Sequence, residues 1–142
     1  MIICGQKEFV GNWVAERIGN ARPWNDYEAV GILSNGKLVG GGVIDNYIPN
    51  ARCSLHIAGE GKRWLNREFF YMLADYIFRQ LNCNVIVNIV DSTNMASMKF
   101  TEHAGFKIVH VIKGGGKDGS DGVVFEMQKD DCKWHRPKEK TK

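Results

Sequence analysis

Apolar residues in the first third of the chain recur at two different spacings. Over residues 7–18 they return every three or four positions, which predicts an amphipathic helix. Residues 29–33 and 38–44 are apolar, β-branched runs, and the Asn35-Gly36 pair between them predicts a tight hairpin because both residues tolerate positive φ. Glycines at 40–42 interrupt the second run, which suggests a bulge or a ligand that passes close to the backbone.

The rest of the chain alternates strands with helices. Residues 52–57 alternate in polarity as a strand does, and a long helix is expected from about residue 66 to residue 81. Residues 85–90 form an apolar run, which predicts a central strand buried on both faces. A short helix, capped by residues 91–93 and ended by Gly105, follows. The last two strands are expected at residues 108–112 and 123–127.

This order of elements predicts a mixed α/β fold in which the long helix bridges one parallel pair of strands. A chain of 142 residues fits one domain, and 44% hydrophobic with 25% charged residues is typical of a globular protein rather than a disordered one. We expect the domain to occupy residues 1–132 and a basic tail to occupy residues 133–142. The tail carries five basic and one acidic side chain, net +4, against +3 for the whole chain. A solvated terminus is favoured there over a nucleic-acid-binding arm.

Cysteine spacing and hydropathy indicate the cellular compartment of the protein and whether it binds a membrane. The four cysteines lie far apart without a CxxC pair, as expected for reduced thiols in a cytoplasmic protein. No apolar run approaches the ~20 residues of a membrane span, and the first residues do not resemble a signal peptide. Cys132 and His135 are too few ligands for a metal site. We therefore expect a cytoplasmic protein with neither a membrane partner nor a bound metal.

Two segments have the residues expected of a cofactor site. The strand at 52–57 leads through a glycine-containing turn into the long helix, and a helix N-terminus binds anions through its free N–H groups and its dipole. Lys62 and Arg63 add positive charge suited to a diphosphate. The second segment is the short helix that begins near Asn94. The candidate cofactor-binding residues are Ile57, Gly59, Gly61, Lys62, Arg63, Trp64, Leu65, Asn94 and Ser97.

Residues 94–106 resemble the pattern Asn-x-x-Ser/Ala, Glu and Gly-Phe of the Gcn5-related N-acetyltransferases (GNAT), and the turn after residue 57 is similar to their pyrophosphate motif. Asp45-Asn46-Tyr47 and His56-Ile57-Ala58 look like a GNAT subgroup common in phages and bacteria. The resemblance implies a GNAT-like α+β fold, with a mixed, mostly antiparallel sheet of six or seven strands flanked by helices. It also implies that acetyl-CoA is the cofactor and that the chain is an N-acetyltransferase, in which a primary amine attacks directly in a ternary complex.

The sequence departs from the family pattern at two places. Arg63-Trp64 stands where the pyrophosphate turn usually has a small residue. Thr101 occupies the position at which many GNAT proteins have a tyrosine that protonates the departing thiolate. The departure at Thr101 supports an alternative, a GNAT-like protein that binds acyl-CoA without catalysis. The basic tail supports another, an acetylating effector that acts on nucleic acid or aminoacyl-tRNA.

The catalytic base is predicted to be His56, with Asp45 as the second candidate. Alternation places His56 on the same face of its strand as Arg52 and Ser54, near the point where strands of this family separate. An imidazole can accept a proton near neutral pH, although a strand histidine can also be satisfied by backbone or solvent. Aspartate at position 45 can equally fix the turn. Candidates for the acceptor pocket are Trp24, Tyr27 and Tyr47. The identity of the amine acceptor, small molecule or protein, and the choice between monomer and homodimer stay open.

Overall fold

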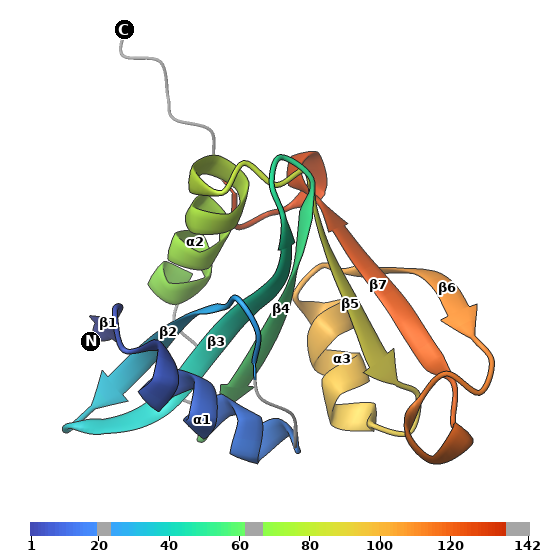
Figure 1. Ribbon diagram of the computed structural model, residues 1–142, viewed down its shortest axis with the longest axis horizontal. Helices are drawn as coiled ribbons and strands as arrows, with labels where there is room; N and C mark the ends of the chain where they lie inside the picture. Colours follow the sequence, from blue (N-terminus) through green and yellow to red (C-terminus); the bar gives the residue numbers. More distant parts are fainter. Residues whose placement is uncertain (20–23, 62–66, 136–142) are drawn as a thin grey trace, which may run out of the picture.

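The computed structural model describes residues 1–19, 24–61 and 67–135. Within these residues, a seven-stranded sheet has the order β1-β2-β3-β4-β5-β7-β6, and every neighbouring pair is antiparallel except β4 and β5 (Figure 1). The predicted mixed, mostly antiparallel sheet is therefore confirmed. Its strands are β1 (Ile2–Ile3), β2 (Glu28–Ser34), β3 (Lys37–Ile48), β4 (Arg52–Gly59), β5 (Val85–Asp91), β6 (Lys107–Ile112) and β7 (Gly122–Gln128).

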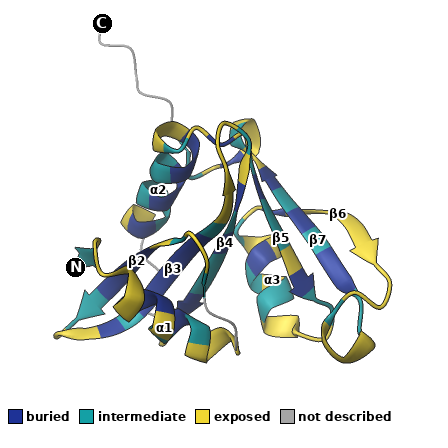
Figure 2. Cartoon of the chain, in the orientation of Figure 1, coloured by how far each residue is buried: buried dark blue, intermediate teal, exposed yellow. Residues whose placement is uncertain are grey.

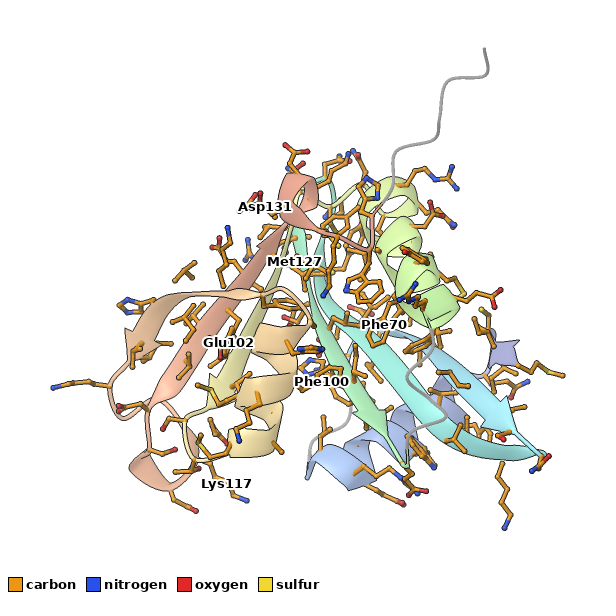
Figure 3. The ribbon with its side chains drawn as sticks, turned by 180° about the vertical axis from the view of Figure 1, so that it is seen from behind. Phe70, Phe100, Glu102, Lys117, Met127 and Asp131 are labelled. Carbon is orange, nitrogen blue, oxygen red and sulfur yellow. The ribbon has the colours of Figure 1, made fainter. Side chains whose placement is uncertain are left out.

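Helices cover the two faces of the sheet unequally. Helix α1 (Lys7–Ile18) lies on one face and contacts β2, β3 and β4, whereas α2 (Arg67–Asp75) and α3 (Met95–His103) lie on the other face (Figures 1 and 3). Helices α1 and α2 bury apolar residues against the strands, whereas the buried residue of α3 is Thr101. The core beneath α1 includes Val10, Val14 and Val43, and the larger core on the opposite face includes Phe69 and Phe125.

The glycines of β3 let the helices approach the sheet closely. A Cβ atom at Gly41 would lie 2.9 Å from Val14 Cγ2 and 3.0 Å from Val10 Cγ1, so a larger residue there would clash with α1. A bulge is present in this run as expected, at Val39 beside the glycines, where the register shifts opposite Ile32 and Leu33. Side chains of α1 and α2 pack on Gly41 and Gly42.

The long helix ends in a wider turn than expected. Tyr76–Gln80 forms a π-helix, η1, in continuation of α2, and the Leu81 N–H donates to the Tyr76 carbonyl over 2.8 Å. The buried side of this helix contains Phe69, Leu73, Ile77 and Phe78, whereas Phe70 and Tyr76 are only partly buried.

The start of α3 also differs from the prediction. The cap is Asn94, whose side chain accepts a hydrogen bond from the Ser97 N–H over 3.1 Å, and residues 91–93 precede it. The predicted end is confirmed, since Gly105 follows the helix with a φ of +107°.

Strand β5 is less buried than its apolar run predicts. Ile86 and Val90 are buried, but Ile89 is 61% exposed. Helix α1 contacts β2, β3 and β4 and leaves the same face of β5 uncovered (Figure 2). The prediction of burial on both faces was therefore wrong, because the periodicity of a strand does not tell how far a helix on the neighbouring strands extends.

Residues after β7 pack on the domain. The Trp134 indole stacks on Phe70 with 5.0 Å between ring centroids, and its N–H donates to the Ala104 carbonyl over 3.3 Å. The boundary expected at residue 132 thus lies inside a packed segment that joins α2 to the end of α3. All four cysteines are free, with Cys4 exposed and the other three buried. In the described ranges no helix has the length and apolar character to cross a membrane.

Candidate active site

The site is the gap that opens where β4 and β5 separate. Their backbone pairing is limited to Arg52 with Val85 and Cys53 with Ile86. Just beyond it, two side chains bridge the strands. Ser54 Oγ donates to the Val87 carbonyl over 2.8 Å. The Asn88 amide accepts from the Leu55 N–H over 2.9 Å and donates to the Leu55 carbonyl over 2.8 Å, and so it replaces a missing pair of backbone hydrogen bonds.

Asn88 was missed by the sequence analysis, although a signal was available. It is the one polar residue inside an otherwise apolar run, and a half-buried amide in such a run needs hydrogen-bond partners. Those partners are the backbone atoms of Leu55, 33 positions earlier in the chain. Only the arrangement of the two strands determines which groups they are.

Beyond Asn88 the gap forms a cleft of about 190 Å³. It brings together residues that the sequence analysis singled out in two separate segments: His56 and Ile57 of β4, and Asn94, Ser97 and Thr101 at the cap and along one side of α3. Thr101 is 6% exposed. The remaining walls are residues 88–91 of β5 and Ile18 at the end of α1.

Strand β4 offers backbone hydrogen-bonding groups to this cleft. Leu55 directs its N–H and its carbonyl toward Asn88, on the β5 side. Alternate residues of a strand use the same edge, so Ile57 directs its N–H and carbonyl to that side as well. By this point β5 has diverged and Ile57 is not paired to it. The cleft wall therefore presents a backbone donor and a backbone acceptor to a ligand.

An imidazole–carboxylate pair lies on the α1 face of the same strands. His56 Nε2 is 2.8 Å from Asp45 Oδ1, with side chains 31% and 13% exposed. A carboxylate can only accept, so Nε2 carries the proton and Nδ1 is the nitrogen free to act as a base when the ring is neutral. The two predicted catalytic residues are therefore partners in one pair. Trp24 packs on the imidazole with 5.0 Å between ring centroids.

The three aromatic residues predicted for the acceptor pocket do not lie together. Trp24 lies beside His56 and donates to the Gly11 carbonyl over 2.9 Å, and Tyr27 is 6.4 Å from Trp24 between ring centroids. Burial, and then the carboxylates of Glu8 and Glu28, raise the pKa of Tyr27. Tyr47 lines a different cavity of about 380 Å³ and donates its hydroxyl to the Leu81 carbonyl over 2.9 Å.

The predicted pyrophosphate turn is described only at its start. Gly59 is the last residue of β4, and Gly61 follows with a φ of +68°. Lys62, Arg63, Trp64 and Leu65 lie outside the described residues. Among those that are described, no group of three or more histidine, cysteine or acidic side chains is arranged to hold a metal.

Aromatic side chains line the α2–α3 face of the gap. Phe70 of α2 and Phe100 of α3 approach each other with 6.4 Å between ring centroids (Figure 3). Together with Arg67, His103, Ala104 and Trp134 they line an apolar cavity of about 280 Å³. A ligand with an extended arm thus has a polar cleft at the strands and an apolar channel between the helices.

A sheet of this order, parted between its two parallel strands and flanked by helices on both faces, defines an acetyltransferase fold. Residues 13–122, more than half of the chain, match the family model of the GNAT acetyltransferase domain. The chain therefore belongs to the GNAT family, as its sequence motifs indicated, and its cofactor is acetyl-CoA. The Ile57 edge and the cleft beside Asn94 fit an arm that enters between the strands.

Solved structures agree with this assignment of the fold. A chimera of the spermidine N-acetyltransferase SpeG from Vibrio cholerae and hSSAT superposes with a TM-score of 0.68 at 14% identity, over 92% of this chain and 97% of that one. The acetyltransferase yncA from Salmonella typhimurium, solved with acetyl-CoA, gives a TM-score of 0.67 at 17% identity, over 92% and 94% of the two chains. No curated protein matches the chain.

Proposed function

We propose that this protein transfers the acetyl group of acetyl-CoA to a primary amine by direct attack, with His56 as the general base. The observation that carries the proposal is the position of His56. It lines the cleft between β4 and β5, and Asp45 orients it from 2.8 Å away. No other described histidine lines that cleft.

The base has a definite task. An alkyl ammonium has an ordinary pKa near 10.4, so most acceptor molecules carry a proton at neutral pH that must be removed before the nitrogen can attack. Nδ1 of His56 accepts that proton, directly or through one water, while Asp45 holds the Nε2–H and stabilises the imidazolium that forms. Trp24 restricts the ring to this orientation by packing on it.

The cofactor is held by groups on both sides of the gap. Bound acetyl-CoA supplies an acetyl group activated as a thioester. The Ile57 N–H offers a hydrogen bond to an acyl oxygen, since backbone donors fixed in a strand need no rearrangement during reaction. Asn94 and Ser97 start a helix beside the cleft, and Gly59, Gly61 and residues 62–65 would bind the diphosphate. A threonine hydroxyl is a poor acid, so we assign no proton transfer to Thr101. The C–S bond of the thioester would break as the amide forms, and the leaving thiolate would take up the second proton of the attacking nitrogen.

The test substitutes His56 by Gln and by Ala, and Asp45 by Asn, and measures acetyl transfer separately from acetyl-CoA binding. A general base typically contributes 10²–10⁴-fold, so both His56 variants should lose transfer by about this factor while still binding acetyl-CoA. His110→Gln is the matched control, because His110 lies on the exposed edge strand β6. Transfer by the His56 variants within about threefold of the parent, with an unmoved acidic limb of the pH–rate profile, would exclude His56 as the base.

Thr101 at the usual tyrosine position favours one competing function, in which the chain binds acyl-CoA without transferring it. Thermal unfolding separates the two. Acetyl-CoA at 100 times its dissociation constant should stabilise the protein by about 2.7 kcal/mol in either case. Stabilisation without release of the coenzyme A thiol, over a panel of amines, would favour the binding protein.

A further inference from the structure

The face of β5 that α1 leaves uncovered forms, with the neighbouring side chains of β4, a groove that begins at His56. Arg52, Ser54 and His56 alternate onto one face of β4. Val87 and Ile89 share that face, because Arg52 is paired in parallel register with Val85. Helix α1 covers β2, β3 and β4 and does not extend over β5, so Ile89 is 61% exposed.

Two cavities follow each other along this face. The cleft at His56 and the cavity of about 380 Å³ at Arg52 share Ile89 as a common wall. The apolar residues that line the second cavity include Tyr47, Ile48 and Val87. We call the continuous surface from His56 past Ile89 to Arg52 the acceptor groove. Its ends are four residues apart on one strand, about 13 Å between Cα atoms.

The guanidinium at the far end of the acceptor groove has no internal counter-ion. Arg17 and Arg79 each have a carboxylate partner, at 2.7 Å and 2.8 Å respectively. For Arg52, no carboxylate of the described residues lies within 4.0 Å, and its side chain is exposed. Glu126 lies two strands away, opposite Val87, and accepts from the Gln128 side chain over 3.2 Å. An anion can therefore reach Arg52 without displacing an existing partner.

We infer that the acceptor carries an anionic group, such as a carboxylate, that binds Arg52 while its amine lies at His56. This rests on the proposed acetyl transfer and names the acceptor class. A guanidinium matches a carboxylate with two parallel hydrogen bonds. The apolar wall formed by Val87 and Ile89 suits an alkyl spacer between the two ends. An acceptor with a second cation in place of the anion would meet Arg52 with like charge and bind more weakly.

Two probes that differ in one group test the inference: ε-aminocaproate, and ε-aminocaproamide, which replaces the carboxylate by a neutral amide. At saturating acetyl-CoA we expect kcat/KM to be about tenfold or more higher for the carboxylate. Arg52→Gln should bring this ratio close to one by raising KM for the carboxylate, with little change in kcat. Arg52→Lys should retain part of the preference, since it keeps the charge without the planar fork. Arg79→Gln is the control and should leave the ratio unchanged.

A direct binding measurement keeps the inference separate from the proposed function. Binding of both probes to the protein loaded with coenzyme A is measured by ligand-detected NMR, for the parent chain and for Arg52→Gln. Tighter binding of the carboxylate that is lost in Arg52→Gln supports the inference even if no amine is acetylated, an outcome that would defeat only the proposed function. Equal binding of the two probes, or faster transfer to spermidine than to ε-aminocaproate, overturns the inference and leaves acetyl transfer intact.

Discussion

Replacing Asn88 by alanine should loosen the point at which the two strands part. The Asn88 amide makes two hydrogen bonds across the gap, of 2.9 and 2.8 Å, to the backbone N–H and carbonyl of Leu55. Leu55 is buried, so these groups lose their partners when the amide is removed. The backbone pairing of β4 with β5 is confined to two residue pairs, so the two hydrogen bonds of Asn88 extend a short ladder.

The size of the effect follows from these contacts. An intramolecular hydrogen bond contributes about 1 kcal/mol net, so the loss of two costs about 2 kcal/mol. The full penalty of unsatisfied buried groups is larger, but the adjoining cleft can admit water to the Leu55 groups. For a chain of this length, about 2 kcal/mol lowers the melting temperature by roughly 6–8 °C.

Calorimetry and urea unfolding of Asn88→Ala, Asn88→Asp and Asn84→Ala provide the measurement. Asn84 is the matched control, because its amide makes one exposed hydrogen bond of 3.1 Å to the Asn50 carbonyl. We expect Asn88→Asp to be at least as destabilised as Asn88→Ala at neutral pH, because a carboxylate would face the Leu55 carbonyl. Its deficit should shrink as the pH falls and the carboxyl becomes a donor. Equal melting temperatures for Asn88→Ala and Asn84→Ala would refute the bridging role.

Three further outcomes are expected. Gly41→Ala should lower the free energy of unfolding by about 1–3 kcal/mol, because the new methyl group overpacks against Val14. Gly42→Ala should lower it less, because the nearest atom lies 3.4 Å away, and chemical denaturation measures both values. A thiol reagent at pH 8 should label Cys4 rapidly and Cys53 slowly, because burial raises the pKa of Cys53; persistence of the fast phase in Cys4→Ser would contradict this assignment. Because of that raised pKa, the Cys53 thiol stays protonated in the folded chain at a pH where it ionises in the unfolded chain. The free energy of unfolding should therefore fall as the pH rises above about 8.5, and melting temperatures measured against pH test this.

The hairpin, helix α1 and the end of α3 could be predicted from local sequence, because each depends on residues close together in the chain. Asn35 and Gly36 both adopt positive φ, 53° and 77°, so the hairpin was predictable from backbone preferences alone. Helix α1 has the bounds that its spacing predicts, and the Gly105 stop is present. The motif of α3 indicated the family without any structure, because its residues act within one helix.

The pair of His56 and Asp45 shows what local sequence could not predict. Alternation placed His56 on one face of its strand, and the Asp45-Asn46-Tyr47 motif pointed to Asp45, but the sequence analysis considered the two residues as alternative bases. They form one pair because the register of β3 with β4 sets Asp45 opposite Ser54, diagonally next to His56. Register across a hairpin with a bulge depends on packing over the whole sheet and not on either residue alone.

Only the tertiary structure determines the gap between β4 and β5, the Asn88 bridge across it and the uncovered face of β5. Nothing in the run at 85–90 tells that β5 pairs with β4 at only two positions, or that Asn88 bonds to Leu55. The burial of Ile89 likewise depends on where α1 ends relative to a strand more than 60 residues away in the chain. Periodicity reports which residues share a face of an element, whereas the partner of that face is fixed by how all the elements pack at once.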